Sequence, residues 1–336
     1  MKKITAALLI LIMSVSLFAC GGSSGDKSRT ATVFAMDTFI SVSAYSDEET
    51  LESVTRLMLD LDNKLSRTKP ESDIGRLNAA GKDPVELSND AAALLSDALY
   101  YCADSDGVFD ITVAPVTDLW NINGDNPQIP STDKLADALM NVNYKYLTVN
   151  GDDAQFLCDG MKCDLGGIAK GYAADRANEL LHTRGVTSAL LEIGSSVYIL
   201  GTKPDGSEYK VGIRDPEGDA SKYVGTVDLK DRYITSSGDY ERFFEVGGER
   251  YCHIFDTSTG WPVDNELHSV TVITESGTLG DYLSTYLFCL GLENGLRRCR
   301  ENGVSALFIT KDKHIYTVGN EFDSFELTAE DYTYEK

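Results

Sequence analysis

The stretch CDLGGIAKGYAADRA, residues 163–177, joins a predicted strand ending at Asp164 to a predicted helix over 168–184. Two adjacent glycines at such a junction let backbone N–H and C=O groups approach a ligand closely. The N-terminus of the helix favours an anion, and Lys170 adds a positive charge. The spacing does not match G-x-x-x-x-G-K-[ST] or G-x-G-x-x-G, so the stretch taken alone also fits a tight strand-to-helix turn with a surface lysine.

Hydrophobic periodicity and turn residues on either side of this junction predict the other elements. Helices are predicted over 47–64, 88–104 and 278–301, with one more starting at Ser131. Strands are predicted over 30–45, 188–201, 209–214 and 222–229, with hairpin-like pattern from 146 and a loop over 67–78. Because hairpins outnumber strand–helix–strand units, the sequence predicts a mixed α/β (α+β) fold with antiparallel sheets and packed helices.

The composition is that of a globular protein. The chain has 336 residues, 42% hydrophobic and 25% charged, enough for one large domain or two modest ones. Its formal net charge is −23, which argues against nucleic acid as a partner, because phosphate backbones are bound by basic surface. An anionic small molecule remains compatible where a local Lys or Arg, a helix N-terminus or a metal ion offsets the charge.

The N-terminus has the pattern of an export signal. Two lysines precede a nearly unbroken apolar run over 6–18, too short for a comfortable membrane span, and no later segment is long and apolar enough for one. The run ends in LFAC, and GGSSGDKS follows Cys20. This resembles a bacterial lipoprotein signal, with residues 1–19 removed, Cys20 lipidated and 20–29 a flexible tether. It predicts a lipid anchor on the extracytoplasmic face of the cell membrane; an ordinary secretory signal is the alternative.

Six cysteines follow Cys20, and an exported chain could pair them. Their spacings are irregular and most lie in apolar runs, which favours free, buried thiols. A local bridge between Cys158 and Cys163, which flank the predicted turn DGMK, is the alternative. A zinc site is poorly supported, because C-x4-C lacks a second pair of cysteines or histidines.

A second candidate for chemistry is GDYLSTYLFCLG, residues 280–291. Asp281 and Thr285 lie four apart on a predicted helix and share a face, with Ser284 beside them. One carboxylate and one or two hydroxyls form a sparse site of hard oxygen ligands, as Mg²⁺ uses when water and substrate phosphates complete its shell. The same residues also fit an acidic helix start with a threonine bonded back into its own helix.

A third candidate is ERYCHIFDTSTGWPVDN, residues 249–265. His253 lies on a predicted strand, followed by Asp256 and a Gly-Trp-Pro turn. A histidine so placed could act as a general base, although a lone strand histidine also fits a structural role. The other histidines, at 182, 268 and 314, have no comparable neighbours in the sequence.

Together these pieces resemble the ApbE family, the FAD:protein FMN transferases, over roughly residues 30–320. The segments that carry the resemblance are AMDTFISV, SDIGRLN, GVFDITVAPVTDLW, DLGGIAKGYAADRA, LLEIGSSVYILG, VGIRDP, ITSSGDYERFFE and HIFDTSTGWPVDN, followed by HSVTVI and GDYLSTYLFCLG. The resemblance implies transfer of the FMN half of FAD to a Thr or Ser hydroxyl of a partner protein, with release of AMP. It also implies a transferase domain over 30–325 before an acidic C-terminal tail at 326–336, and a ligand cleft between two interleaved lobes.

The resemblance also implies roles for individual residues. The residues expected at FAD are Met36, Thr68, Val108, Phe109, Asp110, Asp164, Lys170 and Phe255. The residues expected to hold Mg²⁺ are Gly167 through its carbonyl, Asp281, Ser284 and Thr285. His253 matches the position proposed for the base that deprotonates the acceptor hydroxyl, and Asp281 is a second candidate whose charge metal binding would use. Mg²⁺ would neutralise the diphosphate without a protein nucleophile.

One departure from the family affects the expected activity. Thr68 stands where many members have a tyrosine close to the adenine, and threonine cannot stack on a base. Two alternatives to transfer therefore stay open: a Mg²⁺-dependent FAD pyrophosphatase giving FMN and AMP, and a lipoprotein that binds FAD without turnover. The acceptors implied for a transferase are flavoproteins of membrane redox complexes or extracellular electron carriers.

Overall fold

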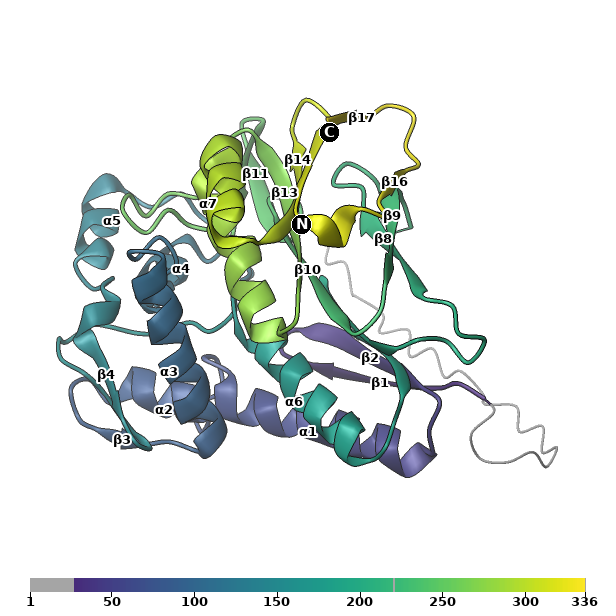
Figure 1. Cartoon of the computed structure of the whole chain (residues 1–336). Helices are drawn as coiled ribbons and strands as arrows, with labels where there is room; N and C mark the ends of the chain where they lie inside the picture. The colour runs from purple at the N-terminus through teal and green to yellow at the C-terminus, as the bar shows by residue number, and fades with distance from the viewer. Residues whose placement is uncertain (1–26, 220, 336) are drawn as a thin grey trace, which may run out of the picture.

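The computed structural model describes residues 27–219 and 221–335, and its centre is a nine-stranded sheet in the order β1-β2-β6-β7-β10-β13-β14-β15-β17 (Figure 1). All neighbouring strands in it are antiparallel except β15 and β17, which are parallel. The strands are β1 (Arg29–Ala35), β2 (Thr38–Ala44), β6 (Ser188–Ile193), β7 (Ser196–Gly201), β10 (Arg232–Gly238), β13 (Leu267–Thr274), β14 (Ser305–Thr310), β15 (His314–Val318) and β17 (Thr333–Glu335). The mixed α/β class with antiparallel sheets is thus confirmed.

Three small sheets surround this one. They are β16-β9-β8, built from β8 (Tyr209–Arg214), β9 (Tyr223–Leu229) and β16 (Glu326–Leu327); β3-β5-β4, built from β3 (Val85–Glu86), β4 (Leu147–Asn150) and β5 (Asp153–Phe156); and the hairpin β11 (Phe243–Val246) with β12 (Glu249–Cys252). The sheet of β8, β9 and β16 packs on one face of the large sheet through a separate apolar cluster.

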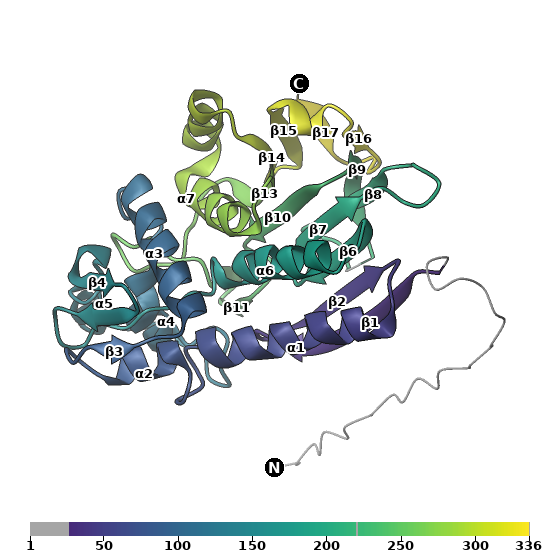
Figure 2. The same cartoon turned by 60° about the horizontal axis from the view of Figure 1, so that its bottom comes forward.

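The helices cover the opposite face and one end of the large sheet (Figures 1 and 2). They are α1 (Glu48–Leu65), α2 (Asp73–Ala79), α3 (Asn89–Asp104), α4 (Ala114–Trp120), α5 (Thr132–Leu139), α6 (Ala169–Thr183) and α7 (Gly277–Asn302), with short 3-10 turns at Ile111–Val113, Tyr144–Tyr146 and Asn320–Phe322. Helix α1 packs on β1 and β2, while α7 packs on β10 and β13. Helices α2 to α5 and the sheet of β3 to β5 lie together at the left of Figure 1. We call this group the helical part; in the sequence it lies between β2 and β6, two neighbouring strands of the large sheet.

Two glycines, Gly171 on α6 and Gly277 on α7, let these helices approach each other closely. A Cβ placed at Gly171 would lie 2.0 Å from the carbonyl oxygen of Gly277, so no larger residue fits without moving a helix. The contact brings the first turn of α6 against the first turns of α7. The contact therefore places the junction that contains Gly166 and Gly167 beside Asp281.

The structure corrects several predicted elements. Residues 30–45 form a hairpin rather than one strand, because Met36 and Asp37 make its turn in the left-handed region, with φ of 54° and 56°. Residues 188–201 form a second hairpin, β6 and β7. No strand ends at Asp164, whose backbone N–H donates to the Ile111 carbonyl.

The structure also contains regular elements in two segments that the sequence predicts to be irregular. The predicted loop over 67–78 contains α2, whose N-cap Ser72 accepts a hydrogen bond from Gly75 N–H. Residues 326–335, predicted as part of a tail, contribute β16 and β17, which pair with β9 and β15. The fold therefore continues past the predicted boundary at residue 325.

All six cysteines from Cys102 to Cys299 are free thiols in the structure, so the alternative bridge between Cys158 and Cys163 is absent. The predicted signal and Cys20 lie outside the described residues. Within residues 27–219 and 221–335, no helix combines the length and apolarity that a membrane span requires.

Candidate functional site

A cavity of about 920 Å³ lies where the helical part meets the large sheet. The cavity is lined by the β1–β2 turn, the end of α1 and the loop after it, residues 108–124, the junction 164–170, the C-terminal part of β10, the segment 253–257 and the first half of α7. Segments from both parts of the fold thus contribute, as expected of a ligand cleft between interleaved lobes. The volume lies near the upper end of the usual range for ligand pockets, about 300–1,000 Å³, so the cavity has room for a large ligand.

Most of the predicted site residues line this one cavity. They are Met36, Thr68, Val108, Phe109, Asp110, Asp164, Gly167, Lys170, His253, Phe255, Asp281 and Thr285. Ser284 is not among the lining residues; it is fully buried, and its hydroxyl donates to the Asp281 carbonyl and lies 2.8 Å from Ser237 Oγ. The cavity wall carries Ser237 in its place.

Asp281 is 3% exposed, and both carboxylate oxygens accept hydrogen bonds. Gly171 N–H donates to Oδ2 at 2.6 Å and Ser196 Oγ donates to Oδ1 at 3.0 Å. Burial raises the pKa of Asp281, and the nearby Lys170 opposes that rise. A carboxylate held in this way is fixed in direction and still borders the cavity.

Oxygen atoms of the right kind for a hard cation gather beside this carboxylate. A Cβ placed at Gly167 would lie 3.8 Å from Thr285 Oγ1, so the glycine backbone runs close to that hydroxyl. Thr285 Oγ1 in turn lies 3.1 Å from Ser237 Oγ. Thr235 Oγ1, on the same stretch of wall, is buried without a hydrogen-bond partner among the described residues. The donor set is compatible with Mg²⁺, which accepts carboxylate, hydroxyl and carbonyl oxygens.

The junction 164–170 forms a turn with α6 starting at Ala169. Asp164 Oδ1 accepts from Gly166 N–H at 2.8 Å, and its other oxygen lies 3.5 Å from Arg67 Nε. Lys170 lies in the first turn of α6, where its Nζ is 3.4 Å from the Gly166 carbonyl. Among the described residues, no carboxylate lies within ion-pair distance of Lys170, so its charge is available to a ligand.

Asp110 lines the cavity but uses its carboxylate within the protein. Oδ1 accepts from the N–H and hydroxyl of Thr112, and Oδ2 accepts from Tyr144 N–H. Burial raises the pKa of Asp110. The side chain therefore holds the neighbouring loop in place.

His253 is half-buried in the cavity wall, and its backbone geometry fixes its orientation. Its N–H donates to the Arg242 carbonyl at 3.1 Å, and its Nδ1 lies 3.2 Å from the same oxygen. A proton on Nδ1 would satisfy that contact and leave Nε2 unprotonated. Burial, with Arg242 and Lys170 nearby, lowers the pKa of His253 to about 4, so the imidazole is neutral at physiological pH.

Sequence reasoning missed several residues of the cavity wall. Arg242 directs a guanidinium N–H to the Asp37 carbonyl at 3.1 Å. Arg67 pairs with Asp118, which Lys162 also contacts at 2.8 Å. Although burial opposes it, these two cations hold the pKa of Asp118 below its usual range. None of these residues shows its position through local sequence pattern, because each reaches the cavity only after distant segments fold together.

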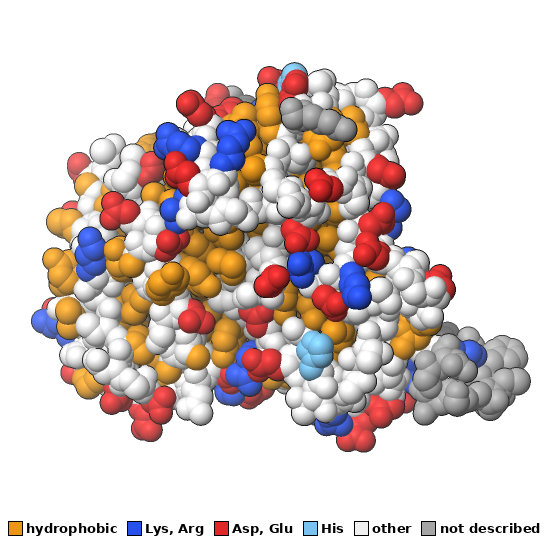
Figure 3. All heavy atoms as spheres, viewed as in Figure 1, with side chains coloured by type: hydrophobic (Ala, Val, Ile, Leu, Met, Phe, Trp, Pro, Cys, Tyr) orange, Lys and Arg blue, Asp and Glu red, His pale blue; other side chains and the backbone are white. Residues whose placement is uncertain are grey.

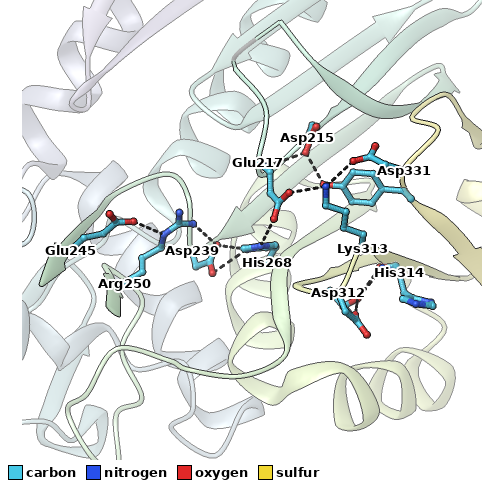
Figure 4. Close-up of polar contacts among 12 residues, drawn as sticks. Asp215, Glu217, Asp239, Glu245, Arg250, His268, Asp312, Lys313, His314 and Asp331 are labelled. Carbon is cyan, nitrogen blue, oxygen red and sulfur yellow. Dashed lines mark hydrogen bonds and ion pairs between the residues drawn. The ribbon is translucent and has the colours of Figure 1, made fainter. Parts of the chain in front are cut away.

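His268 has close acidic neighbours, although none appears beside it in the sequence (Figure 4). Its Nδ1 lies 2.9 Å from Asp239 Oδ1, and its Nε2 lies 3.8 Å from Glu217. The ion pairs continue through Arg250 to Glu245 on one side and through Lys313 to Asp331 on the other. This network does not line the cavity, which leaves His253 as the histidine of the site among the described residues.

Comparisons with known proteins agree with this arrangement. A family model described as the ApbE family matches residues 36–308. The FAD:protein FMN transferase of Treponema pallidum is 34% identical over 320 residues, covering 88% of each chain, and one from Klebsiella pneumoniae is 33% identical over 87% of this chain and 92% of its own. The crystal structure of the ApbE protein of Thermotoga maritima, 30% identical, superposes with a TM-score of 0.82 over 90% of this chain and all of its own. The apo flavinyl transferase ApbE of Pseudomonas stutzeri, also 30% identical, gives 0.78 over 89% and 96%. The chain therefore belongs to the ApbE family.

Proposed function

We propose that this protein is a Mg²⁺-dependent FAD:protein FMN transferase. The observation that supports the proposal best is that one cavity is lined by Asp281 and Thr285 as oxygen donors, Lys170 as a cation without an ion-pair partner among the described residues, and His253 as a neutral base. Such a site offers charge neutralisation and proton acceptance, the two needs of phosphoryl transfer to a hydroxyl. The relatives named above are FAD:protein FMN transferases by name.

The residues that would hold Mg²⁺ are Asp281, Thr285 and the Gly167 carbonyl, with Ser284 acting through its contact with Ser237. The ion would neutralise negative charge on the FAD diphosphate. The same need for neutralisation makes an anionic substrate compatible with a chain of net charge −23. Acidic side chains are spread over the face shown in Figure 3, so attraction of FAD depends on local charge in the cavity.

The proposed reaction forms one phosphoester and breaks one phosphoanhydride bond. The Thr or Ser hydroxyl of the acceptor attacks the phosphorus on the FMN side of the diphosphate, and AMP leaves. His253 takes the hydroxyl proton on its free Nε2. A proton on Nδ1, donated to the Arg242 carbonyl, would leave Nε2 free for this role.

The cellular setting is part of the proposal. A lipid on Cys20 would anchor the chain to the extracytoplasmic face of the cell membrane. The acceptors would then be flavoproteins of membrane redox complexes or extracellular electron carriers, and nucleic acid is not expected among the partners. The signal-like sequence before residue 21 supports this setting.

One assay tests the proposed function against its two alternatives. Residues 21–336 would be incubated with FAD, with and without Mg²⁺ and an acceptor protein, and both acceptor fluorescence in a denaturing gel and free AMP would be measured. We expect Mg²⁺-dependent fluorescent acceptor. AMP and FMN with a dark acceptor would favour the pyrophosphatase, and bound FAD without products would favour the carrier.

Thr68 is expected to permit FAD hydrolysis as a side reaction. Its side chain is exposed at the cavity wall, and its hydroxyl contacts only Ser66 Oγ among the described residues, at 3.0 Å. A threonine there cannot stack on the adenine, which leaves room for water. Thr68→Tyr should lower acceptor-independent AMP release by about threefold or more, since stacking contributes on the order of 1 kcal/mol. An unchanged rate of AMP release in this variant would contradict the role given to Thr68.

A further inference from the structure

The cavity contains a second cation whose charge no protein group uses. Three basic side chains line its described walls: Arg67, Lys170 and Arg242. Arg67 is paired with Asp118 and Asp164, whereas no carboxylate of the described residues lies within ion-pair distance of Lys170 or Arg242. The chain has a net charge of −23 and the cavity wall also carries carboxylates, so two cations without an ion-pair partner there are suited to an anionic group of a ligand.

The contacts of Arg242 leave most of its donors free. A guanidinium carries five N–H donors, and one nitrogen of Arg242 donates to the Asp37 carbonyl at 3.1 Å. That bond ties the guanidinium to the left-handed β1–β2 turn, which itself lines the cavity. The side chain is therefore held at the wall with donors to spare.

The position of Arg242 relative to the base is fixed by its own backbone. The Arg242 carbonyl accepts the His253 N–H at 3.1 Å and contacts Nδ1 at 3.2 Å. Arg242, which precedes β11, and Lys170, in the first turn of α6, line the same cavity as His253, and the charges of both lower the pKa of its imidazole. The donors that would bind an anion and the base that would take a proton thus line the same cavity, with Arg242 and His253 joined through the Arg242 carbonyl.

We propose that Arg242 is a further catalytic residue, whose guanidinium contacts the FAD diphosphate and stabilises the charge that develops on it during transfer. The inference rests on the proposed function. It assigns to Arg242 the fork-shaped contact with phosphate oxygens that a guanidinium makes and an ammonium does not. Lys170 would supply the second positive charge from the opposite element.

The test compares Arg242→Gln with Arg242→Lys and with Arg250→Gln. Glutamine removes the charge but keeps an N–H donor for the Asp37 carbonyl, and lysine keeps the charge. Arg250 lies on the same hairpin and pairs with Glu245 and Asp239 outside the main cavity, so its variant is a matched control. The His253 contact uses the Arg242 carbonyl, which every variant retains.

Three readouts separate catalysis from a structural role. In Arg242→Gln we expect kcat/KM for FAD to fall by about 10²-fold, as for loss of one charged group at a developing charge, while Arg242→Lys loses about tenfold or less. Affinity for FAD should fall while affinity for riboflavin, which has no phosphate, is unchanged. The acid limb of the pH profile should move to higher pH, because a charge that lowers the pKa of His253 is gone.

Different results would overturn the inference. Wild-type kcat/KM in Arg242→Gln, or equal weakening of FAD and riboflavin binding, would show that Arg242 does not contact the diphosphate. If Arg242→Gln fails to fold, Arg242→Lys decides through the same pair of ligands, since a lysine without the fork should weaken FAD and spare riboflavin. Wild-type protein that binds FAD but transfers nothing would remove the proposed function, and the binding comparison would still decide the contact.

Discussion

Asp281→Asn is expected to reduce FMN transfer by about 10²- to 10³-fold while the protein stays folded, and Asp281→Ala should abolish it. Among the groups expected to hold the ion, Asp281 supplies the only carboxylate, and a carboxylate is a stronger ligand for Mg²⁺ than the Thr285 hydroxyl or the Gly167 carbonyl. In other enzymes, loss of one group that stabilises charge in the transition state lowers kcat by about 10²- to 10³-fold. Initial rates of acceptor fluorescence at several Mg²⁺ concentrations measure the effect.

Asp281→Asn is a better test than Asp281→Ala because asparagine preserves the packing around the side chain. Asparagine can still accept from Gly171 N–H and meet Ser196 Oγ, whereas alanine leaves a buried N–H unpaired at a cost of about 1–3 kcal/mol. Asp175→Asn is the matched control, since Asp175 accepts from Gly277 and Thr278 N–H at the same helix junction but does not line the cavity. Full activity in Asp281→Asn, or equal loss in the control, would remove the metal assignment.

His253→Gln is expected to lower transfer by about 10²- to 10⁴-fold, the usual contribution of a general base. Glutamine occupies similar space and cannot take the acceptor proton. FAD binding should change little, because Lys170 and Arg242 remain. Transfer to the acceptor and FAD affinity are measured side by side, and His268→Gln serves as control because His268 lies outside the cavity.

The pH dependence gives a second test of the same histidine. The base works only when neutral, so activity is lost as pH falls through its pKa. For the free enzyme that pKa is about 4, because burial and the charges of Arg242 and Lys170 disfavour the imidazolium. If the base were an exposed histidine, kcat/KM would fall as the pH dropped through about 6.5. We expect kcat/KM to stay within about twofold between roughly pH 5.5 and 7.5; a fall centred near pH 6.5 would show that His253 is not the base.

Local patterns predicted the parts of the site that lie on one element. Asp281 and Thr285 share a helix face by spacing alone, and Lys170 follows a glycine pair at a helix start. The structure has both helices, α6 and α7, within a residue of their predicted bounds. These features are readable because helical spacing alone determines which residues share a face.

Features made by distant contacts were not predictable from one sequence. The pattern of residues 30–45 predicts a single strand and not the β1–β2 hairpin, because the turn residues Met36 and Asp37 include no glycine to mark the turn. Arg242 reaches Asp37 across more than two hundred residues of chain. Ser284 was placed on the ligand face by its neighbours, but its hydroxyl turns back to the helix backbone, which leaves Ser237 at the wall.

The spread of the cavity wall along the chain has a consequence for the order of folding. The wall runs from Met36 to Cys289, and the β1–β2 turn, β2 and α7 take part in it from distant parts of the sequence. No fragment that has just left the ribosome or a translocation channel could close this wall before α7 emerged. If the chain is exported unfolded, as proposed, it would bind FAD only on the far side of the membrane, and its activity there would then require a supply of extracytoplasmic FAD.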